Sequence, residues 1–136
     1  KAKKLKLKNI KFFVADAWKL PFPDNYFDAV LCIAVMHCIP TKTKRQKVLK
    51  EIYRVLKPKG KAKIANWNKE SGRFKNKKKE SFIGWRDKGK RYYYFYTEDE
   101  LKKEIEKSDL KIIFQKSLNQ DNVTPNHSIT FIVQKH

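Results

Sequence analysis

The sequence predicts an α/β fold in which a mostly parallel sheet packs against helices, and two observations carry this prediction. Residues Ala29–Met36 form a nearly unbroken apolar run, as expected for a parallel strand that is covered on both faces. In the helix predicted at Thr43–Leu56, apolar residues recur at intervals of three and four. Charged residues are assigned to the opposite, solvent-facing side of this helix: Lys44, Arg45, Lys47, Lys50 and Arg54.

The other elements follow in chain order. The remaining predicted strands are Ile10–Ala15, Lys61–Trp67, Leu110–Ser117 and Ser128–Lys135. Pro58 and Gly60 end the first helix. A second helix is expected from Thr97 to about Ser108, because Thr97 and Glu100 have the spacing of a capping box. Strands and helices therefore alternate as they do in proteins with parallel sheets.

Length and charge limit the class of protein. At 136 residues the chain is expected to form a single domain with its own hydrophobic core. Its formal net charge of +19 comes from 33 Lys and Arg residues against 14 Asp and Glu residues. Such a field attracts polyanions. A Lys-rich surface that only keeps the protein soluble is the simpler interpretation, but the acids do not balance the bases, so a nucleic-acid partner is favoured.

The two cysteines indicate no metal site. Cys32 and Cys38 form no CxxC pair and have no second Cys/His cluster with zinc spacing. Cys32 lies inside an apolar strand, where a free thiol behaves as a small hydrophobic residue. Both are interpreted as reduced and structural, which is consistent with a cytoplasmic protein. No apolar run approaches the length needed to cross a membrane, so no membrane association is expected.

Several residues are predicted to meet at the carboxyl edge of the sheet, where open α/β sheets bind nucleotide-like ligands. Asp16 and Ala17 follow the first strand, and Ile33 and Ala34 lie near the end of the second. His37 comes just beyond the second strand, so its ring is expected to face the cleft. The alternatives are that Asp16 only caps a turn and that His37 is a satisfied structural histidine.

A basic and aromatic insert is predicted over residues 68–96, between the third strand and the second helix. Recognition of unpaired RNA requires cations that pair with phosphates, beside rings that stack on bases. The candidate RNA contacts are Arg73, Lys77, Lys78, Lys79, Arg91 and Tyr92. The alternative is a solvated basic loop whose aromatic residues pack onto the sheet.

The motif Val14-Ala15-Asp16-Ala17, the segment Leu20–Val35 and the turn Leu56–Gly60 together resemble the second half of a class I S-adenosylmethionine-dependent methyltransferase. The resemblance implies a Rossmann-like sheet of strand order 3-2-1-4-5-7-6, of which this chain supplies strands three to seven, the last one antiparallel. Strands one and two and the glycine-rich cofactor loop are missing, so residues 1–136 are expected to be a partial domain. We expect an amino-terminal portion of about 70–100 residues, as a missing stretch or a separate chain.

The same resemblance implies a role for each residue at the carboxyl edge. Asp16 would accept a hydrogen bond from the adenine amino group of the cofactor, and the backbone amide of Ala17 would meet a ring nitrogen. The backbone of Ile33 and Ala34 would approach the methionine part of the cofactor. Small apolar residues at these two positions fit simple packing equally well.

A narrower resemblance comes from the insert. Trp67-Asn68-Lys69-Glu70, Arg73-Phe74 and the run from Arg91 to Leu101 are similar to the wobble-uridine tRNA methyltransferases, including the domain fused to an AlkB-type oxygenase. Members of that family esterify the carboxyl group of 5-carboxymethyluridine in tRNA, usually with a small zinc-binding activator subunit. The resemblance implies S-adenosylmethionine as cofactor, S-adenosylhomocysteine as product and tRNA as partner. Where the family often has two adjacent His residues this chain has His37-Cys38, so only the first is carried over.

This family resemblance also implies a mechanism, in which the substrate carboxylate attacks the sulfonium methyl group in line. A carboxylate is ionised at neutral pH, so no base is needed and catalysis comes from alignment and from removal of water. His37 and a basic residue, Arg73 or Arg91, would orient the carboxylate. Trp67 would stack on the flipped uridine or wall it off.

Two other functions remain open from the sequence. A small-molecule methyltransferase acting on a quinone or sterol would share the same strand motifs, but it has no use for a strongly basic insert. A non-catalytic module that binds RNA or a partner subunit is favoured by the missing glycine-rich loop. Salt-sensitive binding of tRNA, and binding of S-adenosylmethionine, would separate these functions.

Overall fold

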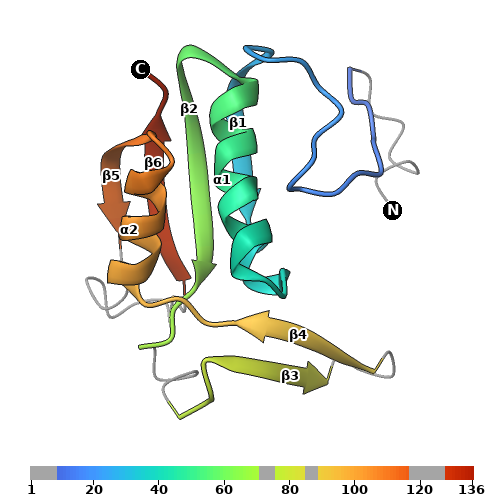
Figure 1. The fold of residues 1–136 in the computed structure, drawn as a ribbon, viewed down its shortest axis with the longest axis vertical. Coiled ribbons are helices and arrows are strands. Elements are labelled where there is room, and N and C mark those ends of the chain that lie inside the picture. The colour runs from blue at the N-terminus through green and yellow to red at the C-terminus, as the bar shows by residue number, and fades with distance from the viewer. Residues whose placement is uncertain (1–8, 71–75, 85–88, 117–127) are drawn as a thin grey trace.

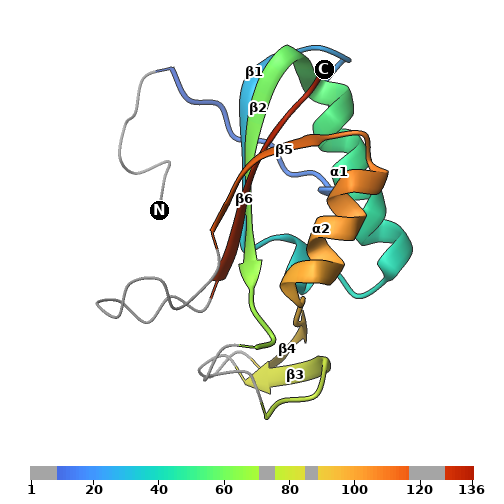
Figure 2. The same ribbon diagram turned by 90° about the vertical axis from the view of Figure 1, so that its left-hand side faces the viewer.

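A mixed sheet with two α-helices on one face forms the body of the protein, and a two-stranded hairpin lies at one end of it (Figures 1 and 2). The computed structural model describes residues 9–70, 76–84, 89–116 and 128–136. Its elements are β1 (Phe27–Ile33), the 3₁₀ helix η2 (Met36–Cys38), α1 (Lys42–Val55), β2 (Leu56–Trp67), β3 (Glu80–Gly84), β4 (Lys90–Tyr94), α2 (Glu98–Lys107), β5 (Lys111–Lys116) and β6 (Ser128–Gln134). The predicted α/β class is confirmed.

The four-stranded sheet has the order β1-β2-β6-β5. β1 pairs with β2 in parallel, while β6 lies antiparallel to both β2 and β5. This is the 4-5-7-6 part of the predicted strand order, with the last strand of the chain inserted antiparallel between the two before it. Parallel pairing places the carboxyl ends of β1 and β2 at the same edge of the sheet.

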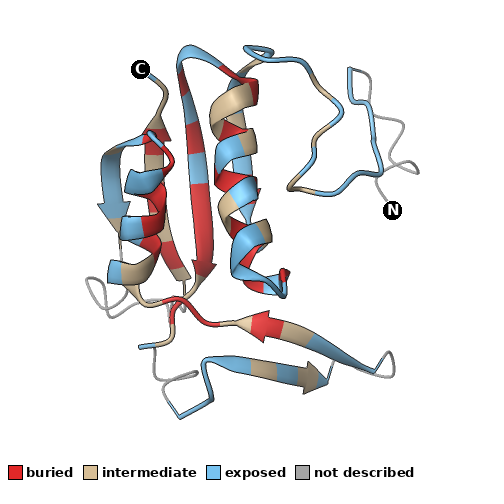
Figure 3. Ribbon diagram, viewed as in Figure 1, coloured by how far each residue is buried: buried red, intermediate tan, exposed pale blue. Residues whose placement is uncertain are grey.

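Packing of helices on the sheet forms the main core, which Figure 3 shows as the buried inner sides of α1 and α2. Val48, Leu49 and Ile52 of α1 are buried there, as their spacing predicts. Cys32 of β1 is also buried, and burial raises the pKa of its thiol to about 12. A thiol held neutral in this way is inert, which agrees with a structural role.

Arg45 does not face solvent as predicted, because it is only 3% exposed. Its position on α1 continues the stripe formed by Val48, Leu49 and Ile52, so the helical spacing carries its side chain inward. Its Nη1 donates a hydrogen bond of 2.7 Å to the carbonyl oxygen of Ile39. Helical position therefore decides the orientation of Arg45, whose Nε is buried without a hydrogen-bond partner among the described residues.

The second helix begins at its predicted cap. The hydroxyl of Thr97 accepts a hydrogen bond of 3.3 Å from the backbone N–H of Glu100. The carboxylate of Glu100 does not complete a capping box, because it accepts a 2.6 Å hydrogen bond from the Tyr94 hydroxyl and pairs with Lys79. Leu101 of this helix is buried against the sheet.

The strand predicted at Ile10–Ala15 is wrong: this segment has no strand pairing and is exposed, with Phe13 58% accessible. In the predicted order, a third strand reaches the rest of the sheet only through strands one and two. Among the described residues nothing pairs with the outer edge of β1, so the segment has no partner to hold it as a strand.

The described helices cover one face of the sheet only, as Figure 2 shows in side view. On the other face Leu31 and Ile33 of β1 are 73% and 50% exposed. The expectation that this apolar strand is covered on both faces therefore fails for the part of the chain that the structure describes. No helix in these ranges is long and apolar enough to span a membrane.

The described part of the basic insert contains an antiparallel hairpin of β3 and β4. Its two ends are held together, because Asn68 and Tyr96 form a bridge and the Lys69 N–H donates a 2.8 Å hydrogen bond to the Tyr96 carbonyl oxygen. The hairpin is thus anchored at the carboxyl end of β2. Arg73, predicted to contact RNA, lies outside the described residues.

Candidate functional site

The candidate site lies at the carboxyl edge of β1 and β2, where the hairpin meets the sheet (Figure 1). The chain leaves β1 through Ala34 and turns into η2, which carries His37. β2 ends at Trp67, so the parallel pairing brings the two predicted catalytic residues together. Tyr93 of β4 covers them from the side of the hairpin.

His37, Trp67 and Tyr93 form a triangular cluster of rings, named the Trp67 stack, in which the His37 and Tyr93 centroids are also only 5.8 Å apart. The His37 and Trp67 ring centroids are 4.6 Å apart with an interplanar angle of 23°, and Trp67 stacks on Tyr93 at 4.7 Å. The backbone N–H of Trp67 donates a 3.1 Å hydrogen bond to Nδ1 of His37. His37 is 2% exposed. The imidazole is therefore packed against Trp67 and Tyr93 and does not face the open cleft that the sequence predicted.

Burial also sets the charge of His37. It lowers the pKa of the imidazole to about 4, so the ring is neutral at physiological pH. Because Nδ1 accepts a hydrogen bond, the single proton is assigned to Nε2. A neutral imidazole can donate through Nε2 but supplies no positive charge to a substrate.

Asn66 belongs to this site and was missed by the sequence analysis. Its Oδ1 accepts a 3.3 Å hydrogen bond from the backbone N–H of His37. Its Nδ2 is buried and has no hydrogen-bond partner among the described residues. The signal was present in the sequence, since an Asn directly before Trp67 interrupts the apolar side of a buried strand.

Ala34 marks a strained turn at the end of β1. Its φ of 58° lies in the left-handed region, which is unfavourable for a residue with a Cβ. A 2.8 Å hydrogen bond from its N–H to the Ala65 carbonyl oxygen holds this conformation. Ala34 and the preceding Ile33 are exposed, so backbone and apolar surface are accessible where the cofactor was predicted. Strain of this kind concentrates at functional sites.

Asp16 is exposed, and its carboxylate makes no hydrogen bond or ion pair within the described residues. The turn that it begins is closed by its backbone, whose carbonyl oxygen accepts a 3.0 Å hydrogen bond from the Lys19 N–H. Two residues on, Trp18 lies beneath the Lys44 ammonium group, 4.7 Å from the ring centroid. This contact ties the turn to the start of α1. Within the described residues, no hydrogen bond or ring contact joins Asp16 or Ala17 to the Trp67 stack.

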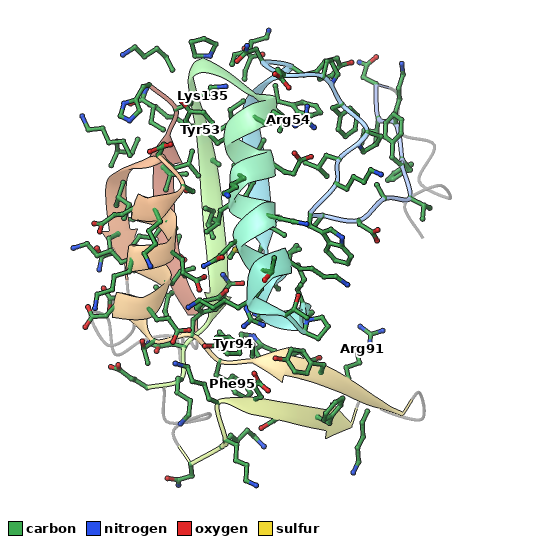
Figure 4. The ribbon with its side chains drawn as sticks, in the orientation of Figure 1. Tyr53, Arg54, Arg91, Tyr94, Phe95 and Lys135 are labelled. Atoms are coloured by element: carbon green, nitrogen blue, oxygen red, sulfur yellow. The ribbon has the colours of Figure 1, made fainter. Side chains whose placement is uncertain are left out.

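The candidate RNA contacts of the hairpin differ in their surroundings. Arg91 is exposed on β4, and Figure 4 shows it on the side of the strand that faces α1. It lies near Cys38, where burial raises the pKa of the thiol and the Arg91 charge partly opposes that effect. Tyr92 is half-buried, and its hydroxyl is buried without a partner among the described residues. Its ring makes an edge-to-face contact with Phe82 of β3, with the ring centroids 5.8 Å apart.

The three consecutive lysines before β3 also differ in whether they form an ion pair. Lys79 pairs with Glu100, and its ammonium lies 5.6 Å from the centroid of the Tyr94 ring. Lys77 and Lys78 are exposed and form no ion pair in the described ranges. These two therefore retain charges that a phosphate could meet.

A buried polar cluster lies behind the stack, between α1, β4 and α2. The Arg45 guanidinium carbon is 3.8 Å from the centroid of the Tyr94 ring. The Tyr96 hydroxyl donates a 3.0 Å hydrogen bond to Glu104, and burial raises the pKa of this carboxyl group. Two successive residues of β4 thus make these contacts, Tyr94 with the Arg45 cluster and Tyr93 with the Trp67 stack, so the strand is held from both sides. In the described ranges, no three His, Cys, Asp or Glu side chains are grouped so that they could hold a metal ion.

Comparison of the sequence with known proteins finds methyltransferases. Residues 1–64 match a family described as "Methyltransferase domain". The chain is 41% identical over 61 residues to the ubiquinone/menaquinone biosynthesis C-methyltransferase UbiE of Vibrio cholerae, which is 45% of this chain and 22% of that protein. It is 31% identical over 132 residues to the provisionally named methyltransferase ECU09_1500 of Encephalitozoon cuniculi, covering 88% of this chain and 58% of the relative.

Solved structures agree with this. An S-adenosylmethionine-dependent methyltransferase of Methanosarcina mazei superposes with a TM-score of 0.74 at 20% identity, covering 92% of this chain and 66% of its own. A second match comes from the complex between the Haloferax volcanii Trm112 methyltransferase activator and a methyltransferase. A chain of that complex superposes with a TM-score of 0.73 at 17% identity, and the match covers 99% of this chain and 66% of the other. The fold is that of the class I methyltransferases. The chain spans between about a fifth and three fifths of the length of the two curated relatives.

Proposed function

We propose that this chain forms part of an S-adenosylmethionine-dependent methyltransferase that esterifies the carboxyl group of a modified wobble uridine in tRNA. The observation that carries the proposal is the Trp67 stack at the carboxyl edge of β1 and β2, directly beside a basic hairpin. Ligands of open α/β sheets bind at this edge. An aromatic wall there suits a flat base that has been turned out of its stack.

Residues of this chain are suited to contact the adenine and methionine parts of the cofactor. The unpaired carboxylate of Asp16 can accept from an exocyclic amine such as that of adenine. The exposed backbone at Ile33 and Ala34 allows close approach of the methionine part. The buried Nδ2 of Asn66, which lacks a partner among the described residues, is an additional donor near the same strand ends.

The residues of this chain contribute mainly by positioning. S-adenosylmethionine, when bound, supplies an electrophilic methyl group. A substrate carboxylate is already ionised at neutral pH, so the site needs to align it and remove its water. We assign this orienting role to Arg91, which lies on the same strand as Tyr93 and near Cys38, and Arg73 remains a candidate. His37 holds Trp67 through the Nδ1 hydrogen bond and the stack, and Trp67 excludes water from the edge.

The substrate class is inferred from charge. The net charge of +19 favours a polyanionic substrate, and Lys77 and Lys78 add exposed cations next to the candidate site. We place the protein in the cytoplasm, where reduced cysteines are the rule. A small-molecule substrate would need an enclosed apolar pocket instead.

The uncovered surfaces beside β1 support a further polypeptide in the active assembly. Its outer edge is unpaired among the described residues, and apolar side chains of β1 and the segment at Ile10–Val14 are exposed. Exposed edges and apolar patches of this kind are normally covered. We propose that strands one and two, as a further part of the protein or a separate chain, cover the β1 edge. A small activator like that in the Haloferax complex is the second proposed partner.

A second candidate function is methylation of a small molecule. It is favoured by the 41% identity to UbiE, which exceeds the identity to any of the other proteins compared above. That match covers under half of the chain, so it leaves the hairpin and its charges without a function.

Transfer of a radiolabelled methyl group to unfractionated tRNA by the full-length protein, with and without an activator subunit, tests the proposal. An ester predicts label that is released by mild alkali, whereas a methyl group on carbon or on a ring nitrogen stays bound. Alkali-stable label would exclude the carboxyl chemistry. Label on quinones and none on tRNA would establish the second candidate. Absence of S-adenosylmethionine binding by the full-length protein would leave a non-catalytic binding module.

A further inference from the structure

Two surface hollows flank the outer face of α1, on the helical side of the molecule that Figure 1 faces. The first, of about 500 Å³, is lined by Trp18, Lys19, Lys47, Lys50 and Glu51. The second, of about 210 Å³, lies between α1 and α2 and is lined by Gln46, Lys50, Glu104, Lys107 and Ser108. The lysines that line the two hollows are all exposed. Their ammonium groups therefore lie on both sides of the outer face of α1, which separates the two hollows.

The two acids that line these hollows both accept hydrogen bonds from groups other than the lysines. Glu51 accepts hydrogen bonds from Arg54 Nε at 2.7 Å and from the backbone N–H of Leu20 at 2.8 Å, and the Arg54 bond lowers the pKa of the Glu51 carboxyl group. Glu104 is buried and accepts from the Tyr96 hydroxyl. Neither acid forms an ion pair with the lysines at the rims within the described residues.

The lysines themselves have no acidic partner. Lys19, Lys47, Lys50 and Lys107 form no ion pair with any described residue. A hollow of similar volume, about 500 Å³, on the far side of α2 provides a contrast. Its lysines, Lys102 and Lys111, stand beside exposed acids, which are Glu106 and Asp109. Among these three hollows, the two beside α1 are therefore lined by more lysines than acids, whereas the third is lined by equal numbers of both.

We propose that the outer face of α1 is a second contact surface for the phosphate backbone of RNA, centred on Lys47 and Lys50 and separate from the hairpin. Side chains three positions apart on a helix are neighbours, so these two can bind adjacent phosphates. Trp18 lines the first hollow, held by Lys44 on its ring, and offers an aromatic surface for an unpaired base. The proposal rests on the proposed function for its choice of RNA over other polyanions.

Salt-dependent binding of a fluorescent tRNA anticodon stem-loop to the full-length protein tests this surface. Each lysine that binds a phosphate contributes roughly 0.7–0.9 to the slope of log K against log salt. Lys47→Gln with Lys50→Gln should therefore reduce the slope by about 1.4–1.8. The matched control is Lys102→Gln with Lys111→Gln, which removes the same charge around the contrasting hollow and should change the slope by much less.

The outcomes separate this inference from the proposed function. Equal effects of the two double variants would mean that only net charge matters, and would overturn the α1 surface. An unchanged slope in the Lys47 and Lys50 variant, with a reduced slope in Lys77→Gln with Lys78→Gln, would also overturn it while supporting the hairpin. Binding of heparin but not of the stem-loop would exclude RNA and with it both proposals.

Discussion

The backbone N–H of Trp67 donates to Nδ1 of His37 at 3.1 Å while the two rings stack. This pair joins the ends of two parallel strands, since His37 follows β1 and Trp67 ends β2. His37 thus supplies both a hydrogen-bond acceptor for the Trp67 backbone and a packing surface for the Trp67 ring. The orientation of Trp67 at the candidate site consequently depends on a neutral, buried imidazole.

Substitution of His37 tests that dependence. His37→Ala removes the acceptor of a Trp67 N–H, at about 1–3 kcal/mol, and the ring stack, at about 0.5–1.5 kcal/mol. We expect the free energy of unfolding in denaturant to fall by about 2–4 kcal/mol. His37→Asn retains an oxygen that can accept the same hydrogen bond, so it should restore part of the loss. Equal destabilisation by Ala and Asn would show that the Nδ1 hydrogen bond contributes little.

The pH dependence of stability provides an independent test of His37. Burial lowers its pKa from 6.5 to about 4, so between these values the unfolded chain binds a proton that the folded protein does not. The contribution of His37 is therefore fully present above pH 6.5 and is lost as the pH falls towards 4. Unfolding free energies should decrease by up to roughly 1.4 kcal/mol per pH unit within this window. The matched His37→Asn variant should lack this slope, and an identical slope would assign it to other groups.

Arg45 provides a prediction about the hairpin. Its guanidinium lies over Tyr94 and donates to Ile39, so it links α1 to β4 and to the turn after η2. Arg45→Lys keeps the charge but loses the planar stacking and the directed donor. Loss of the directed, charged hydrogen bond to Ile39 should lower the unfolding free energy by about 1.5–3 kcal/mol.

The control for Arg45 lies on the same helix. Lys47→Ala removes an exposed cation from the outer face of α1 and should change the stability by less than about 0.5 kcal/mol. Denaturant unfolding of both variants compares them directly. An Arg45→Lys protein as stable as the Lys47→Ala protein would refute the assigned link.

Periodicity and apolar runs in the sequence predicted both helices and the strands of the main sheet, because local patterns reflect which face is buried. The segment at Ile10–Ala15 has the same apolar character, yet it forms no strand. Its conformation depends on pairing partners elsewhere, which its own residues do not reveal. Arg45 was predicted to face solvent for a different reason. Its charge suggested exposure, whereas its position on the buried stripe of α1 carries the side chain inward.

The candidate site was predictable only in part. His37 and Trp67 follow parallel strands, and that topology places them at one edge. Burial of His37 could not be predicted, because the covering ring of Tyr93 comes from the hairpin much later in the chain. The role of Asn66 likewise depends on a contact across the strand ends.

Asp16 supplies the prediction that bears most directly on the cofactor. Its carboxylate is exposed and unpaired among the described residues, so Asp16→Ala should leave the stability nearly unchanged. Loss of a charge-assisted hydrogen bond of about 1.5–3 kcal/mol should weaken binding of S-adenosylhomocysteine by about 10- to 150-fold. Calorimetric titration of the full-length protein measures this affinity.

Asp24→Ala is the matched control, because it removes a carboxylate from the same stretch of chain. Asp24 pairs with Arg54 at 2.9 Å on the surface, where such pairs contribute little. The control should bind S-adenosylhomocysteine as the unmodified protein does. Because the two variants carry the same change in net charge, a difference between them isolates the position of the carboxylate. Equal affinities in both variants would remove Asp16 from the cofactor site, even though its turn is tied to the start of α1 beside η2.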